Sequence, residues 1–127
     1  MNYEITGSIL GFEKTTKVAI KAIDNLFLTM KDTANENISF TLANPYQLRE
    51  YTFDLPIDIK IILEINEDTS IDVYNIVVIQ NPLENSTVNF LAPIIVNNDN
   101  KKIAQAVLDG KQYPNFGMAE SIKSFKE

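Results

Sequence analysis

The sequence predicts a mainly β protein, a small antiparallel β-barrel or sandwich of short strands with one or two short helices. Short runs of β-branched and aromatic residues recur along the chain, and polar turn signals separate them. Only one stretch has a clear helix start. Of the 127 residues, 45% are hydrophobic and 22% charged, so we expect one domain over residues 1–127 with a single hydrophobic core.

The first half of the chain predicts five short extended segments followed by a helix. The segments cover residues 2–5, 18–23, 26–30, 38–42 and, after the Asn44-Pro45 turn, 46–53. Asp54 is a good N-cap residue and a proline is tolerated early in a helix, so we expect the helix over residues 56–65. Aliphatic residues at every second position from Ile57 to Ile65 would also suit a strand, which leaves this period ambiguous.

The second half predicts two strands and a hairpin. Residues 72–80 are rich in β-branched and aromatic side chains, as a buried strand requires. From Val88 to Val96 an apolar residue stands at every second position, which would place all of them on one side of a segment that Pro93 bends or interrupts. Residues 97–100 (NNDN) are a turn signal. Residues 102–108 then return as a strand or, by propensity, as two helical turns, and the preceding turn favours the strand.

The tail after Pro114 places Met118, Ile122 and Phe125 at helical spacing. This spacing predicts a terminal helix docked on the sheet of its own chain, or an apolar strip that a partner binds. Acidic residues between 66 and 72 raise the question of a calcium site, but the loop lacks the central glycine and the closing glutamate of an EF-hand. We expect a solvated connection between helix and strand there.

The composition argues against an enzyme. The chain has neither cysteine nor histidine, which removes thiolate nucleophiles, disulfides, and the side chain that most often serves as a base or a transition-metal ligand. The four glycines are isolated and form no phosphate-binding loop. We expect no catalytic residue, no cofactor and no metal. The net charge of −6, with one arginine, disfavours direct binding of nucleic acid and favours basic protein partners.

No secretory leader pattern and no run of about 18 apolar residues occurs in the sequence. We therefore expect a cytoplasmic protein that does not bind membranes. A monomer is expected.

Four stretches, with two shorter ones after them, form a recognisable pattern. They are residues 9–13 (ILGFE), 40–46 (FTLANPY), 74–79 (YNIVVI) and 86–97 (STVNFLAPIIVN), followed by 105–108 (QAVL) and 113–114 (YP). In content, order and separation they resemble the FliW family of flagellar assembly factors, from residue 3 to about 115. The run Thr-Val-Asn-x-x-Ala-Pro-Ile is the most specific part. Ala106 stands where a larger aliphatic residue is common, and the tail after Pro114 follows no family pattern.

The resemblance implies a non-enzymatic regulator that switches between two protein partners. FliW-like proteins bind CsrA, a small dimeric RNA-binding repressor of flagellin translation, and they also bind flagellin that has not been exported. Binding would keep CsrA off the flagellin message until accumulating flagellin displaced it. Two alternatives remain at this point: a small-ligand-binding β-barrel of unknown substrate, and an RNA-binding barrel, which requires a basic face lined by aromatic residues.

The residues that contact partners are predicted from their place in these stretches. The candidates are Asn44, Pro45, Tyr46, Asn89 and Pro93. Turn formation and sheet geometry would explain the same residues equally well. We expect Phe90 in the core, and we expect Phe116 or Phe125 to be exposed anchors for a partner, because aromatic residues are enriched at binding hot spots.

Overall fold

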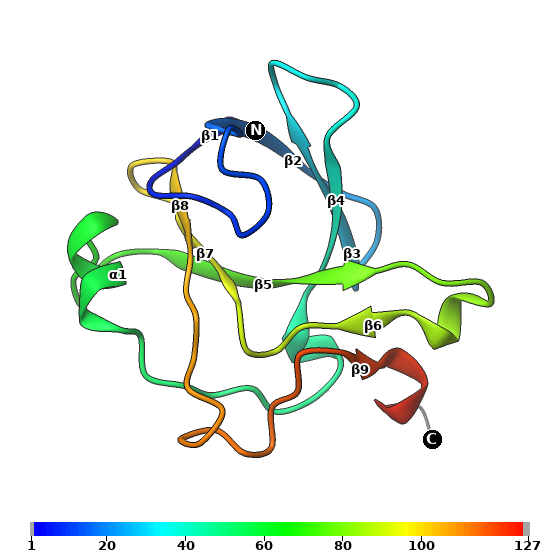
Figure 1. Ribbon diagram of the computed structural model, residues 1–127. Coiled ribbons are helices and arrows are strands. Elements are labelled where there is room, and N and C mark those ends of the chain that lie inside the picture. Colours follow the sequence, from blue (N-terminus) through cyan, green and yellow to red (C-terminus); the bar gives the residue numbers. More distant parts are fainter. Residues whose placement is uncertain (1, 126–127) are drawn as a thin grey trace.

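The structure, a computed structural model, describes residues 2–125 and contains a closed barrel of seven strands (Figure 1). The barrel strands are β1 (Asn2–Ile5), β2 (Lys17–Ala22), β3 (Phe27–Asp32), β4 (Ser39–Ala43), β5 (Ile71–Val78), β7 (Ile94–Asn97) and β8 (Lys102–Gln105). Around the ring they follow the order β4-β3-β2-β1-β8-β7-β5, and pairing of β4 with β5 closes it. β6 (Thr87–Val88) and β9 (Glu120–Ser121) extend the sheet from β5. The predicted mainly β class is confirmed.

The helices are short. They are α1 (Ile57–Ile62) and the 3-10 helices η1 (Pro45–Gln47), η2 (Leu83–Asn85) and η3 (Ile122–Phe125). Within residues 2–125, none of them has the length and apolar character needed to cross a bilayer. α1 is shorter than the predicted 56–65. Pro56, and not Asp54, is its N-cap residue, and the helix ends at Ile62, with Leu63 as the C-cap and Glu64 in the left-handed region at φ 57°. Residues 66–70 form the mostly exposed connection from α1 to β5, as predicted.

The barrel interior is filled by apolar side chains from every strand of the ring. Cross-strand partners meet at one level, as Leu28 does with Leu42 and Val96 with Ile103. The buried members of this interior core are Ile5, Ile9, Val18, Met30, Phe40, Leu42, Ile94, Val96 and Ile103. β5 adds the partly buried Tyr74 and Ile76.

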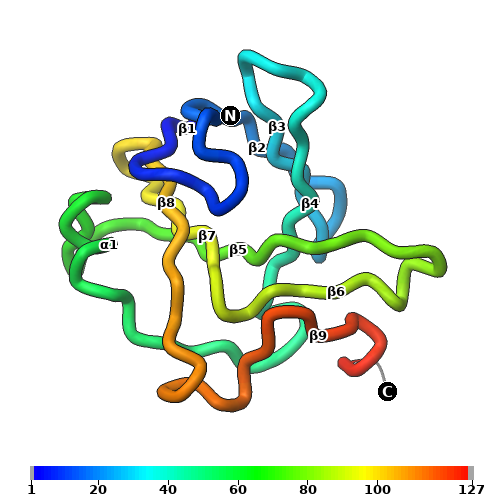
Figure 2. The backbone as a smooth tube through the Cα atoms, in the orientation of Figure 1, coloured from blue at the N-terminus to red at the C-terminus, as the bar shows by residue number. Residues whose placement is uncertain are grey.

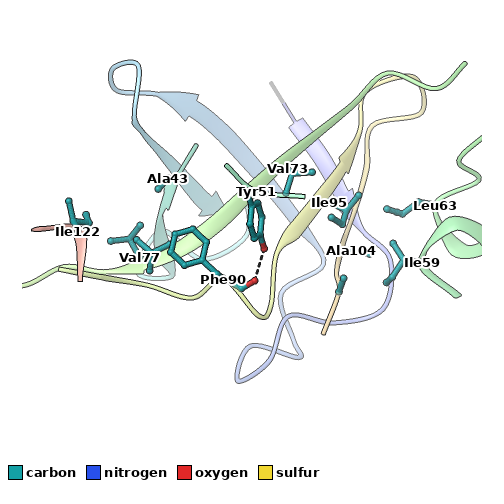
Figure 3. Packing of buried hydrophobic residues seen from close by; sticks show 12 residues of the cluster. Ala43, Tyr51, Ile59, Leu63, Val73, Val77, Phe90, Ile95, Ala104 and Ile122 are labelled. Carbon is teal, nitrogen blue, oxygen red and sulfur yellow. Dashed lines mark hydrogen bonds between the residues drawn. The ribbon is translucent and has the colours of Figure 1, made fainter. Parts of the chain in front are cut away.

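A second core lies on the outer face of the sheet. The side chains that alternate with the interior ones, such as Val73 on β5 and Ile95 on β7, point outward into it (Figure 3). Tyr51, from the connection between β4 and α1, and Ile122, from the C-terminal segment, are buried against this face. The Tyr51 hydroxyl donates a hydrogen bond of 2.6 Å to the Phe90 carbonyl. The single core expected from the sequence is therefore two cores that share one sheet.

Residues 46–53 do not form the predicted strand. Pro45 has no N–H with which to continue the β4 ladder, so the chain turns into η1 and then runs without regular structure towards α1. Figure 2 shows this connection passing beside the C-terminal segment, to which the Asp54 N–H is linked by a hydrogen bond donated to the Tyr113 hydroxyl. Tyr51 and Phe53 still pack into the outer core. The apolar residues of this segment therefore indicated that one side of it is buried, and they did not indicate a hydrogen-bonded strand.

The apolar side chains from Val88 to Val96 were predicted to lie on one side of the segment, but they lie on both faces of the sheet. Val88 and Phe90 belong to the outer core, whereas Ile94 and Val96 face the barrel interior. The bend that reverses them separates β6 from β7 and contains Pro93, as predicted. The hairpin of β7 and β8 is also confirmed, although β8 ends at Gln105 and not at residue 108.

The tail does not form the predicted helix. β9 pairs with β6, and η3 follows it. Ile122 is buried, whereas the Met118 side chain is 70% exposed, so the helical spacing does not describe one face. The tail is nevertheless docked on the sheet of its own chain, as the first of the two interpretations expected.

Candidate interaction surface

The Asn44-Pro45-Tyr46 stretch forms a turn and exposes one of its three side chains. The Asn44 Oδ1 accepts a hydrogen bond from the Tyr46 N–H at 3.1 Å and so caps η1. Pro45 is buried. Tyr46 is 55% exposed and is the most accessible member of this stretch, while Asn44 is partly exposed. For Asn44 and Pro45, turn formation explains the residue type.

Asn89 and Pro93 also have structural roles. The Asn89 Oδ1 accepts a hydrogen bond from the Leu91 N–H at 3.0 Å, and the Asn89 carbonyl accepts one from the Asn75 Nδ2 at 2.8 Å. Pro93 is buried, and its carbonyl accepts a hydrogen bond from the Ala106 N–H. Asn89 is partly exposed, so its side chain remains accessible at the bend that it shapes.

The expectation that Phe116 or Phe125 is exposed is wrong. Both are partly buried against the outer core, where the guanidinium carbon of Arg49 lies 5.0 Å and 5.8 Å from their ring centroids. Arg49, the only arginine of the chain, also pairs with Glu120 at 3.2 Å. These two phenylalanines hold the C-terminal segment on the barrel, and a role as partner anchors stays untested.

An exposed apolar groove is the feature that sequence reasoning missed. Its lining residues are Leu10, Phe12, Phe40, Ile76, Val78, Thr87, Asn89, Gln105 and Met118. None of these described lining residues is charged. Leu10, Val78 and Met118 are 62%, 56% and 70% exposed, so much of the apolar lining faces water. Exposed apolar side chains gathered in one place are typical of protein-binding, membrane-binding or ligand-binding surfaces.

A tight loop presents the two N-terminal residues of the groove. The Phe12 N–H donates to the Ile9 carbonyl at 2.8 Å, and the turn passes through Gly11 at φ 84°, a left-handed conformation that a side chain would strain. The Leu10 N–H donates to the Gln105 side chain at 2.9 Å, which ties the loop to the end of β8. Phe12 packs edge-on against Phe40 with 4.6 Å between ring centroids. The loop is therefore fixed against the barrel.

The groove coincides with the stretches that carry the family resemblance. Every lining residue except Met118 lies within residues 9–13, 40–46, 74–79, 86–97 or 105–108. These stretches are far apart in sequence, and the barrel brings one or two side chains of each to the same place. The signal in the sequence was the pair of apolar residues on either side of Gly11, which belong to no predicted strand.

Two tyrosines near Asp72 keep their protons at neutral pH. Burial raises the pKa of Tyr74 to about 12, and the Asp72 carboxylate adds to the rise. Burial raises the pKa of Tyr46 as well, again with a contribution from Asp72. Together with Asn44 they line a hollow beside the start of β5. Phenols that stay protonated are hydrogen-bond donors and poor general bases, which suits polar contacts and not proton abstraction.

Comparisons with known proteins identify the family. A family model described as FliW protein matches residues 2–116. Flagellar assembly factor FliW 2 of Wolinella succinogenes is 46% identical over 125 residues, which are 98% of this chain and 92% of that protein. Flagellar assembly factor FliW of Campylobacter lari is 41% identical over 126 residues, or 98% of this chain and 96% of that protein. A crystal structure of the flagellar assembly factor FliW has the same fold, with a TM-score of 0.87 at 20% identity over 99% of this chain and 86% of that one. The matched model and the identity to these relatives show that the chain belongs to the FliW family of flagellar assembly factors.

Proposed function

We propose that this chain is a non-enzymatic regulator of the bacterial cytoplasm that binds unexported flagellin and the translational repressor CsrA in a partner switch. While flagellin is scarce, the chain holds CsrA away from the flagellin message. Flagellin that accumulates displaces CsrA, which then represses translation. Such a switch needs only negative coupling between two binding equilibria. The chain acts as a monomer with a single domain over residues 1–127.

The apolar groove is the observation that carries the flagellin half of this proposal. A subunit that awaits assembly exposes apolar surface that the polymer later buries, and a neutral apolar groove can cover such a segment. Leu10, Val78 and Met118 have much apolar surface left to bury. Each square ångström of apolar area removed from water contributes about 25 cal/mol, so a partner that covers these side chains gains affinity from them.

The test is a calorimetric titration of the purified chain with flagellin and, separately, with CsrA. A Val78→Asp variant places a carboxylate on the groove wall, where a bound apolar segment would strip it of water. We expect this variant to bind flagellin at least about tenfold more weakly than the wild type, which corresponds to about 1.4 kcal/mol.

Ile23→Asp is the matched control. Ile23 is an aliphatic residue of similar exposure, 59% against 56% for Val78, and it lies at the turn between β2 and β3, away from the groove. Equal flagellin affinity for both variants would remove the groove from the proposal. Absence of heat and of co-migration with either flagellin or CsrA would end the proposal itself.

A small-ligand-binding barrel is the weaker alternative. Barrels that carry small molecules keep an open interior, whereas nine buried side chains fill the interior here. The groove lies at the rim of the barrel, where Phe40 and Ile76 of the interior core meet the exposed side chains of Leu10, Val78 and Met118, and it is too open to enclose a small molecule. A protein-sized ligand fits this surface better.

A further inference from the structure

The negative charge of this chain is concentrated in one segment. Residues 54–72 contain six acidic residues and one lysine, which accounts for −5 of the net charge of −6. The acidic residues are Asp54, Asp58, Glu64, Glu67, Asp68 and Asp72, and all six are exposed. The rest of the chain is close to neutral. Lys102, from outside the segment, pairs with Glu64, and the other five carboxylates would attract a cationic ligand to α1 and its flanking residues.

The same segment exposes a row of large aliphatic side chains. Ile57 and Ile61 lie one helical turn apart on α1 and are 73% and 69% exposed, and Ile62 beside them is 38% exposed. These three side chains are called the isoleucine ridge. The opposite face of the helix, with Ile59 and Leu63, is buried in the outer core (Figure 3). The ridge therefore points away from the barrel and takes no part in its packing.

The end of the helix that carries the ridge is held rigidly. The Leu63 carbonyl accepts hydrogen bonds from the Asn97 Nδ2 at 2.6 Å and from the Asn100 Nδ2 at 3.1 Å. Lys102 pairs with Glu64 at 3.3 Å. All three partners come from the hairpin of β7 and β8. A surface mounted in this way loses little conformational entropy when a partner binds, which favours affinity.

We propose that the isoleucine ridge and its acidic rim form the docking surface for the basic, RNA-binding partner in the proposed function. This inference rests on that function and adds the surface that it uses. A protein that binds RNA carries clustered Lys and Arg to neutralise phosphates. Those cations would face the carboxylates of residues 54–72 while an apolar depression on the partner covers Ile57 and Ile61.

Charge selects this occupant over the others. A second copy of the chain would bring another −5 against the same rim, and both nucleic acid and an anionic lipid surface would be repelled as well. The ridge is also separate from the apolar groove. α1 lies near the start of β5, whereas Ile76 and Val78 of the groove lie at the other end of β5 (Figure 1). Binding through the ridge would also hold the acidic segment beside the basic surface that RNA needs.

The experiment titrates CsrA into the wild type, an Ile57→Ser/Ile61→Ser variant and an Asp58→Lys/Asp68→Lys variant. Both pairs are exposed, so the fold should survive, which circular dichroism would check. The controls are Ile23→Ser and Glu36→Lys, which change an exposed isoleucine and an exposed carboxylate outside the segment. We expect each ridge or rim variant to weaken CsrA binding at least about tenfold, with no change in flagellin binding. Added salt should weaken CsrA binding by the wild type more than CsrA binding by the Asp58→Lys/Asp68→Lys variant.

The outcomes separate this inference from the proposed function. If the wild type binds CsrA and the ridge variant binds it equally well, the inference is overturned and the function stands. A wild type that binds flagellin but not CsrA at low salt overturns both the CsrA half of the function and this inference. A ridge that mediates self-association, seen as a dimer in sedimentation that Ile57→Ser/Ile61→Ser abolishes, would also overturn it.

Discussion

Replacing Arg49 should loosen the C-terminal segment from the barrel. The Arg49 Nη1 donates hydrogen bonds of 3.2 Å to the Asn115 carbonyl and to the Glu120 carboxylate. Its guanidinium carbon also lies 5.0–5.8 Å from three aromatic ring centroids. The rings belong to Phe90, Phe116 and Phe125. The side chains of Arg49 and Glu120 are only 20% and 27% exposed, so water screens this ion pair less than a surface pair.

The magnitude follows from what Arg49→Met removes. Methionine keeps apolar contact with the rings but loses the charge and the donors. A hydrogen bond to a charged group contributes about 1.5–3 kcal/mol, and a cation–π contact contributes about 0.5–2 kcal/mol. One guanidinium makes all of these contacts, so they do not add, and we expect the free energy of unfolding to fall by about 3 kcal/mol. For a chain of this length that is a drop of about 11 °C in Tm.

Two measurements check this prediction. Thermal and urea denaturation give the stability, and amide hydrogen exchange shows where it is lost. The Phe90 N–H donates to the Gly117 carbonyl and the Ile122 N–H to the Ser86 carbonyl, so both amides should lose protection, while those of β2 and β3 keep it. The stability of Arg49→Lys should lie between those of the wild type and Arg49→Met, because lysine keeps the charge but lacks the planar guanidinium that stacks on the rings. Stability within 1 kcal/mol of the wild type for Arg49→Met, or retained protection at Phe90, would refute the reasoning.

Three further changes test the interpretation of single residues. Tyr51→Phe leaves the buried Phe90 carbonyl without its 2.6 Å donor, and we expect denaturation to show a loss of about 1–3 kcal/mol. Asn44→Ala removes the cap of η1 and should cost about 1 kcal/mol while leaving flagellin and CsrA titrations unchanged, which would establish turn formation as its role. The hydrogen bond from the Ala34 N–H is the main cause that lowers the pKa of Asp32. The ionised carboxylate therefore stabilises the fold, fully so above the pKa that an aspartate has in the unfolded chain, about 3.9. The stability gap between wild type and Asp32→Asn should be full at pH 7 and should close as pH falls below about 4.

The strands were predictable where apolar residues at alternate positions face one side of the sheet and are buried there. β2, β3 and β4 follow their predicted ranges within two residues, because their alternate side chains fill the barrel. The parallel pairing of β1 with β8 was not predictable, since it joins Glu4 to Lys102 and depends on how the ring closes. The alternation from Val88 onward misled because every second residue is buried on both sides of a bend, first in the outer core and then in the interior.

The interaction surfaces were less predictable than the family. Asn44, Pro45 and Pro93 take part in turns and bends of the fold, and sequence alone does not separate that role from partner contact. The groove joins Leu10 to Met118 across almost the whole chain, and the isoleucines of α1 looked like one more buried pattern. Only the three-dimensional structure shows which apolar side chains remain exposed outside the two cores.

The positions of the two surfaces constrain how the proposed switch works. The groove and the isoleucine ridge lie toward opposite ends of β5, so two clients bound as proposed would not compete for the same side chains. Negative coupling must then come from a clash between the clients or from a change in β5, and in either case each client weakens the other by the same factor. A short flagellin peptide that fills only the groove separates these mechanisms. If the peptide weakens CsrA binding as full-length flagellin does, the coupling passes through β5. If the peptide has no effect but full-length flagellin does, the clients clash, and independent binding of both full-length clients refutes the switch.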